Sequence, residues 1–206
     1  MVVEQLRARG IRDERVLAAM ARVPRELFVP EPMRPYAYED AALPIGARQT
    51  ISQPFMVALI CEQLALRGDE RVLDVGTGSG YQAAVLAELA GEVYSIERVP
   101  ALAERARESL AEAGYERVHV HVGDGTLGLP EHAPYGAIAV AAAAPGLPDA
   151  LYEQLEERGR LVVPVGSRRE QQLEVVVRSP EGPAVLRSVP CRFVPLLGEK
   201  GFRSGQ

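Results

Sequence analysis

Residues 71–80, RVLDVGTGSG, are the stretch that decides the fold. The stretch begins with an apolar run that predicts a short buried strand, interrupted by the acid Asp74. Three glycines then occupy alternate positions: Gly76, Gly78 and Gly80. The apolar segment 81–90 that follows predicts a helix. A strand that leads through a glycine-rich turn into a helix places unobstructed backbone N–H groups beside a ligand, although an ordinary turn would also fit.

Apolar runs on the C-terminal side of this stretch alternate between strand and helix patterns. The predicted strands are 71–75, 92–97, 117–122, 135–141 and 160–165, and the predicted helices are 79–90, 100–113 and one near 148–157. This alternation predicts an α/β fold with a doubly wound, mostly parallel sheet and ligands at the carboxyl ends of its strands. Two further strand-like segments, 172–179 and 184–196, flank a Ser-Pro-Glu-Gly turn and predict a C-terminal antiparallel hairpin.

The N-terminal part of the chain predicts a helical cover. Residues 1–30 show helical spacing of apolar side chains, and the proline-rich segment 25–46 predicts an ordered but irregular region. Pro54 suits the first turn of a helix that ends near Leu66, which places Ser52 at or just before its N-terminus. We expect one domain, 1–206, made of a cover and active-site segment (1–66), a cofactor-binding core (71–166) and C-terminal strands (172–202).

Composition limits the class of protein. The 206 residues carry a net charge of −5 and no basic tract, which argues against a grip on nucleic acid. No apolar run is long enough to cross a membrane and the start is charged, so we expect a cytoplasmic monomer without a membrane partner. The two cysteines, Cys61 and Cys191, fit no disulfide framework or metal spacing, so we predict that both are buried free thiols. The chain contains no Asn, which heat adaptation or GC-rich coding would equally explain.

Acids lie at or just beyond the carboxyl ends of the first three strands of the core. The G-x-G-x-G spacing with an acid two residues earlier is typical of S-adenosylmethionine-dependent methyltransferases, whereas the dinucleotide fingerprint needs a third glycine where Tyr81 stands. Glu97 ends the second strand, where a carboxylate can accept hydrogen bonds from two ribose hydroxyls. Asp124 lies between glycines after the third strand and suits an adenine amino group. We predict that Asp74, Glu97 and Asp124 line one rim. The alternatives are a solvent-facing Glu97 and an Asp-Gly turn at Asp124.

Nucleophile chemistry has little support in the sequence. His119 and His121 alternate on the third strand and indicate a half-exposed edge strand rather than a metal site, and His132 in its loop has no expected role. No base accompanies a Ser or Cys nucleophile. A carboxylate acceptor would need none, since a carboxyl group ordinarily has a pKa of about 4 and is ionised at neutral pH. Ser52 could then aim an acceptor oxygen at a methyl group, or it could merely cap the helix.

Segments along the whole chain resemble the protein-L-isoaspartate (D-aspartate) O-methyltransferase family. The segments are QTISQPFMVA (49–58), VLDVGTGSGYQAAVLAEL (72–89), GDGTLG (123–128), AAAPGLP (142–148), GRLVVPVG (159–166) and RFVPLLGEKGF (192–202). The glycine motif is common to most methyltransferases, whereas Thr50–Pro54 and RFVPL are much more specific. Ala141 and Gly136 depart from the residues usual in this family, Thr and Asp.

The resemblance implies a Rossmann-like class I fold and methyl transfer from S-adenosylmethionine, which becomes S-adenosyl-L-homocysteine. The acceptor would be the α-carboxyl of L-isoaspartyl and D-aspartyl residues in damaged proteins and peptides, whose ester returns through a succinimide. It implies that Ser52 is the active-site serine. The expected cofactor residues are Asp74, Gly76, Thr77, Gly78, Ser79, Glu97, Arg98, Gly123, Asp124 and Gly125. The expected substrate residues are Thr50, Ile51, Gln53 and Pro54.

Two other functions remain open at this point. A methyltransferase acting on RNA or a small molecule would share the cofactor half, although the Asn/Asp-Pro-Pro-aromatic segment of nucleobase enzymes is replaced here by AAAAPGLP. A non-enzymatic cofactor-binding module would not need the complete segment around Ser52. We expect no metal.

Overall fold

The computed structural model describes residues 1–203, without the side chains of residues 187 and 188. Its main sheet has seven strands in the order β5–β4–β3–β6–β7–β8–β9. The strands are β3 (Arg71–Val75), β4 (Glu92–Glu97), β5 (Val118–Val122), β6 (Tyr135–Val140), β7 (Leu155–Gly166), β8 (Gln171–Ser179) and β9 (Gly182–Cys191). The five neighbouring strands β5, β4, β3, β6 and β7 pair in parallel, whereas β8 pairs antiparallel with β7 and with β9. The doubly wound, mostly parallel sheet with a C-terminal hairpin is therefore confirmed.

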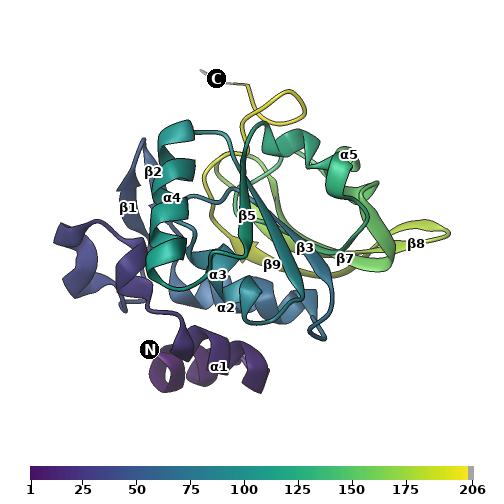
Figure 1. The fold of residues 1–206 in the computed structure, drawn as a ribbon. Coiled ribbons are helices and arrows are strands. Elements are labelled where there is room, and N and C mark those ends of the chain that lie inside the picture. Colours follow the sequence, from purple (N-terminus) through teal and green to yellow (C-terminus); the bar gives the residue numbers. More distant parts are fainter. Residues whose placement is uncertain (204–206) are drawn as a thin grey trace.

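Helices cover both faces of the sheet (Figure 1). The α-helices are α1 (Glu14–Arg22), α2 (Pro54–Leu64), α3 (Tyr81–Ala87), α4 (Pro100–Glu112) and α5 (Asp149–Tyr152). One face carries a core of buried side chains from α1 to α4, and the other packs against α5 and the C-terminal segment. Short helical turns complete the connections: η1 (Val2–Leu6), η2 (Arg7–Arg9), η3 (Arg25–Phe28), η4 (Glu31–Tyr36), η5 (Gly125–Leu127) and η6 (Pro130–His132). Among residues 1–203, no helix is long and apolar enough to span a membrane.

The structure corrects the sequence prediction at three elements. Within the predicted irregular cover, β1 (Leu43–Gly46) and β2 (Gln49–Ile51) pair as a small antiparallel sheet. The helix predicted near 148–157 ends at Tyr152, because β7 already begins at Leu155, which pairs with Tyr135 of β6. The strand predicted over 184–196 ends at Cys191, and the chain then leaves the sheet and crosses the carboxyl ends of the strands.

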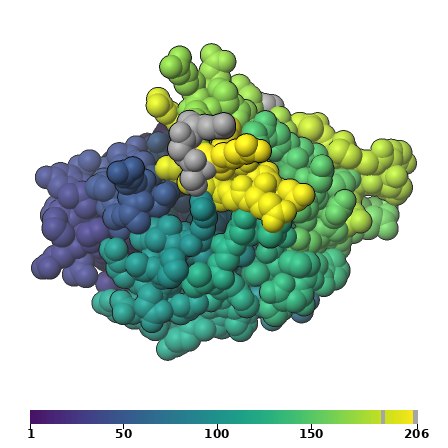
Figure 2. Space-filling model, turned by 90° about the horizontal axis from the view of Figure 1, so that it is seen from above, coloured from purple at the N-terminus to yellow at the C-terminus, as the bar shows by residue number. Residues whose placement is uncertain are grey.

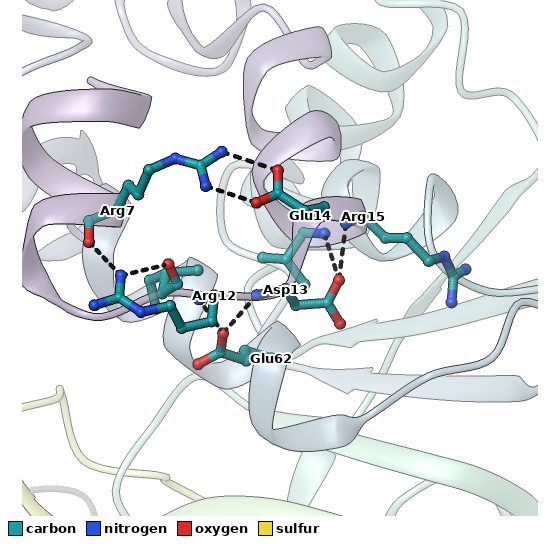
Figure 3. A network of polar contacts seen from close by, with 8 residues as sticks. Arg7, Arg12, Asp13, Glu14, Arg15 and Glu62 are labelled. Carbon is teal, nitrogen blue, oxygen red and sulfur yellow. Dashed lines mark hydrogen bonds and ion pairs between the residues drawn. The ribbon is translucent and has the colours of Figure 1, made fainter.

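Polar contacts fix the N-terminal cover to α2 (Figure 3). The Asp13 carboxylate caps α1 by accepting the backbone N–H groups of Arg15 and Val16. The backbone N–H groups of Arg12 and Asp13 donate to Oε1 of Glu62 on α2, at 2.6 and 2.9 Å. A capping residue contributes about 1 kcal/mol to helix stability. The cover is thus held against the helix that begins two residues after Ser52.

Candidate active site

A cavity of about 380 Å³ opens at the carboxyl ends of β3 and β4. Its walls come from the glycine turn, the end of β4, the segment 49–52 and the C-terminal segment 194–197. Figure 2 shows this face, on which the C-terminal segment, in yellow, lies between the blue N-terminal region and the green part of the chain. The position agrees with the rule that open α/β sheets bind ligands beyond the carboxyl ends of their strands.

The glycine turn forms one wall of the cavity. Residues 76–79 all line it, which brings the predicted cofactor residues Gly76, Thr77, Gly78 and Ser79 together. Gly76, Gly78 and Gly80 have φ of +95°, +55° and +90°, a region that other residues rarely adopt. The side chain of Thr77 turns inward and its hydroxyl hydrogen-bonds that of Ser95 at 2.6 Å. The alternate glycines are therefore required by the backbone of the turn itself.

Glu97 lies where the sequence predicts it, on the cavity wall at the end of β4. The residue is only 7% exposed. Its carboxylate accepts the N–H of Gly78 at Oε2, at 2.8 Å, and the N–H of Val99 at Oε1, at 2.9 Å. Each carboxylate oxygen can accept a further hydrogen bond. Glu97 thus presents a fixed pair of acceptors to the cavity, and Arg98 and Gly125 line the same cavity.

Asp74 does not lie on the rim beside Glu97, so this part of the prediction is wrong. Its carboxylate is fully buried below the glycine turn and accepts hydrogen bonds from Nε2 of Gln82 and the hydroxyl of Ser95, both at 2.7 Å. Burial raises its pKa to about 6, against the two hydrogen bonds, and the charge of Glu97 adds to the rise. Side chains alternate along β3, so Leu73 and Val75 face the α5 side of the sheet and Asp74 faces the side of α3, which contains Gln82.

Asp124 is the second acid that lies outside the cavity wall. Its Oδ1 accepts from the backbone N–H and the hydroxyl of Thr126, and its Oδ2 accepts the N–H of Glu199 at 2.7 Å. Burial opposes the ionised form, but these hydrogen bonds lower the pKa of Asp124. The Cβ of any larger residue at position 198 would lie 2.0 Å from Oδ1. Asp124 therefore anchors the C-terminal segment and does not line the rim of the cavity as predicted.

Ser52 lies between two hollows. It lines the main cavity and also an adjoining hollow of about 300 Å³. The walls that the two hollows share are Thr50, Ser52, Ala141 and Val194. Gln53 is the N-cap of α2, and the side chain that accepts an N–H group of its first turn is that of Asp40, whose Oδ1 lies 3.0 Å from the nitrogen of Phe55, so the helix-cap interpretation of Ser52 is wrong. Ser52 therefore lies at the boundary between the hollows.

Arg25 fixes the backbone of the Ser52 segment, a role that the sequence did not reveal. This arginine is fully buried. Its Nη2 donates to the carbonyl of Ser52 at 2.8 Å, and its Nε donates to the carbonyl of Ala37 at 2.7 Å. The guanidinium carbon lies 4.6 Å from the ring centre of Tyr81, which itself lines the cavity. A cation held over an aromatic face in a desolvated site is stabilising.

The remaining predicted residues divide between the two hollows. Thr50 and Ile51 line the main cavity, Gln53 lines the adjoining hollow, and Pro54 and Gly123 line neither. The sequence assigned no site role to the C-terminal segment, whose residues Val194–Leu197 cover the cavity. This segment is held by backbone bonds from Ala143 to Val194, at 2.8 Å, and from Leu196 to Ala143, at 2.7 Å. The family-specific motif RFVPL was the available signal.

Comparisons with known proteins agree with this geometry. The family model described as "Protein-L-isoaspartate(D-aspartate) O-methyltransferase (PCMT)" matches residues 1–201. A protein-L-isoaspartate O-methyltransferase of Methanoculleus marisnigri is 54% identical over 203 residues, covering 98% of this chain and 92% of the relative. One of Marinobacter nauticus is 58% identical over 204 residues, covering 98% and 93%.

Solved structures give the same result. A putative enzyme of this kind from Plasmodium falciparum, in complex with S-adenosyl-L-homocysteine, superposes with a TM-score of 0.84 at 28% identity and covers 95% of this chain and 96% of that one. A second structure with the family name has a TM-score of 0.86 at 30% identity, and the match covers 97% of this chain and 66% of that one.

Proposed function

Because this chain belongs to the protein-L-isoaspartate(D-aspartate) O-methyltransferase family, we propose which of its residues perform that family's reaction. The chain transfers a methyl group from S-adenosylmethionine to the α-carboxyl group of isoaspartyl residues in proteins and peptides. A methyltransferase for RNA or small molecules and a non-enzymatic module are not favoured, because relatives with this one name match almost the whole chain. When bound, S-adenosylmethionine supplies a methyl group on a positively charged sulfur.

The residues of the main cavity fit such a ligand. Glu97 offers two oriented acceptors, which suit neighbouring ribose hydroxyls. Gln82 also lines the cavity, and its Oε1 is buried without a hydrogen-bond partner among the described residues. A buried acceptor without a partner is costly, and an ammonium group would satisfy it. We therefore assign the ribose to Glu97 and the amino acid part of the cofactor to the side of Gln82 and the glycine turn.

Ser52 is the proposed catalytic residue, and its position between the two hollows is the observation that supports this most. The main cavity suits the cofactor, and the adjoining hollow, bounded by Gln53, Met56 and Phe193, is the proposed position of the isoaspartyl peptide. The acceptor carboxylate is already ionised at neutral pH, so no base is required. We propose that the Ser52 hydroxyl donates to one carboxylate oxygen and directs the other toward the methyl group, with Arg25 holding the serine in place.

The C-terminal segment has a second role in this proposal. Val194, Leu196 and Leu197 cover the cavity with apolar side chains. Such a cover excludes water, which strengthens electrostatic interactions inside the site and leaves the carboxylate as the acceptor.

The substitution Ser52→Ala tests this assignment. We expect kcat for an isoaspartyl peptide to fall roughly ten- to a thousandfold, which is the cost of losing one well-placed donor. The affinity for S-adenosylmethionine should stay unchanged, because Ser52 acts on the acceptor. Methyl transfer would be measured with an isoaspartyl peptide and its aspartyl twin, and cofactor binding by calorimetry.

Ser109→Ala is the matched control, since Ser109 lies on α4 and does not line the main cavity. This control should keep wild-type kcat. A folded Ser52→Ala variant with wild-type kcat would show that Ser52 has no part in catalysis. Equal activity of the wild-type enzyme on the isoaspartyl peptide and on its aspartyl twin would contradict the substrate assignment.

We further propose that the chain acts as one domain and as a cytoplasmic monomer, without nucleic-acid or membrane partners. The net charge of −5 and the absence of a basic tract support the exclusion of nucleic acid. Cys61 and Cys191 are free, which supports a reducing compartment. Light scattering of the purified chain would test the monomeric state, and a dimeric mass would contradict it.

A further inference from the structure

The three histidines of the chain gather around one tyrosine at the edge of the sheet. Tyr94 belongs to β4, and its ring stacks on that of His132 with 4.1 Å between centroids. The rings of His119 and His121, on the edge strand β5, lie 5.0 and 6.0 Å from it. The Tyr94 hydroxyl donates to Glu92 at 2.8 Å, which fixes the tyrosine. The sequence correctly indicated an edge strand, but it gave His132 no role and led us to expect no metal.

Two of these histidines also converge with a carboxylate. The ligand atoms of His121, Glu131 and His132 all lie within 4.8 Å of one another. His121 belongs to β5, whereas Glu131 and His132 belong to η6, about ten residues further along the chain. The arrangement thus joins a sheet edge to the loop beyond it. We propose that His121, Glu131 and His132 form a binding site for a divalent transition-metal ion such as Zn²⁺.

The donor set suits this class of ion. Zinc prefers imidazole nitrogens and carboxylate oxygens at about 2.0–2.2 Å, which places tetrahedral ligands about 3.5 Å apart. The Glu131 side chain is exposed, so it can rotate about its own bonds to place an oxygen on the ion. His132 is already oriented by its stacking on Tyr94, and such outer contacts orient metal ligands. Three protein ligands leave one coordination position open to water.

Other sites for zinc are poorer in the described part of the chain. His121, Glu131 and His132 are the one such group of three among its described residues. Cys61 is fully buried, and burial raises the pKa of its thiol, which disfavours the thiolate that binds metal. Burial also raises the pKa of Cys191, to about 11. His119 has a separate neighbour, since its Nε2 lies 3.9 Å from Oε1 of Glu92.

A bound ion would cross-link the sheet edge to the loop that follows β5. The same loop contains η5 and Gly125, which lines the main cavity. Metal binding would therefore stabilise the folded chain through ligand linkage. The site is distinct from the Ser52 region, so this inference does not depend on the proposed methyl-transfer mechanism.

Calorimetric titration of Zn²⁺ into the metal-free full chain, prepared without an affinity tag, tests the proposal. We expect one ion per chain and a higher Tm in the presence of zinc. The double variant His121→Ala/His132→Ala should bind at least about tenfold more weakly, because loss of a single outer partner already costs about 10–100-fold. His119→Ala is the matched control, since it removes a histidine on the same strand outside the trio, and it should bind zinc as the wild type does.

Two additions keep the test decisive. Glu131→Gln, at an exposed position, replaces the double variant if the latter fails to fold, and it should also weaken binding and reduce the zinc-dependent rise in Tm. The Co²⁺ complex should lack the charge-transfer band of a thiolate ligand. Absence of saturable binding, equal binding in a folded double variant or in Glu131→Gln, or a thiolate band would overturn the assignment.

Discussion

At the scale of single residues, the buried Asp74 carboxylate links the stability of the free chain to pH. Its pKa of about 6 in the folded chain is above that of the unfolded chain, so the folded state holds the proton more tightly. The stabilisation from this group is present at low pH and is lost as the pH rises through about 6.

The substitution Asp74→Asn should therefore stabilise the free chain at neutral pH. A rise of about two pKa units corresponds to about 3 kcal/mol, which is the upper limit of the gain. The difference in the free energy of unfolding between variant and wild type should grow mainly between about pH 4 and about pH 6 and level off above about pH 7, as measured by urea denaturation. Asp69→Asn, at an exposed position, is the control and should show no such growth. A pH-independent difference for Asp74→Asn would contradict the argument.

The sequence predicted which residues mark the site better than it predicted their directions. Gly76, Gly78 and Glu97 were identified from spacing, and all three lie on the cavity wall. Asp74 and Asp124 were placed beside Glu97 because each is near a strand end. Asp74 instead binds Ser95, 21 residues away, and Asp124 binds Glu199, 75 residues away, so the directions of both side chains depend on partners distant in sequence. Arg25 was missed for the same reason.

At the scale of elements, the C-terminal segment depends on the absence of a side chain at Gly198. A Cβ there would lie 2.0 Å from Oδ1 of Asp124, so Gly198→Ala must displace either Asp124 or the segment. Hydrogen bonds to a charged group contribute about 1.5–3 kcal/mol, and loss of the Glu199 contact should loosen the cover of the cavity. We expect the Kd for S-adenosylmethionine to rise about tenfold, as measured by calorimetry.

Gly146→Ala provides the matched control for this experiment. A Cβ at Gly146 would meet nothing within 4 Å, so the same chemical change should leave the Kd unaltered. If the folded Gly198→Ala variant bound the cofactor as tightly as the wild type, the covering role of the segment would be refuted.

Long periodic elements could be predicted and short ones could not. The strands β3, β4 and β5 match the predicted ranges to within one residue, because their continuous or alternating apolar residues are bounded there by glycines and charges. The pairing of β1 with β2 escaped prediction, since three- and four-residue strands with a proline show little periodicity. The end of β9 at Cys191 was also missed, because RFVPL is as apolar as a strand but bonds to Ala143 outside the sheet.

At the scale of the whole molecule, the proposed site uses all three parts of the chain. The segment containing Ser52 comes from the N-terminal region, the glycine turn and Glu97 from the core, and Val194–Leu197 from the C-terminal region. The α/β class and the mostly parallel sheet follow from the alternation of elements, which is readable in sequence, whereas the order of the strands does not. The two hollows that meet at Ser52 are not readable there, because they form only when these three parts pack together.

The hydrogen bonds to Asp124 also affect how readily this aspartate is converted to isoaspartate over time. Asp124 and Gly125 form the chain's single Asp-Gly pair, in which the unhindered backbone nitrogen of glycine can attack the preceding carboxyl carbon. Here both carboxylate oxygens are hydrogen-bonded and the pKa of Asp124 is lowered, so the group stays ionised and is a poor target for that attack.

An enzyme that methylates isoaspartate is thus expected to form little of its own substrate at this position. Peptide mapping after prolonged heating should find less isoaspartate at Asp124 in the wild type than in Gly198→Ala, where the carboxylate is released. Equal damage in both chains would show that the hydrogen bonds give no protection. The chain also contains no asparagine, so it lacks the amide side chain that is most prone to deamidation.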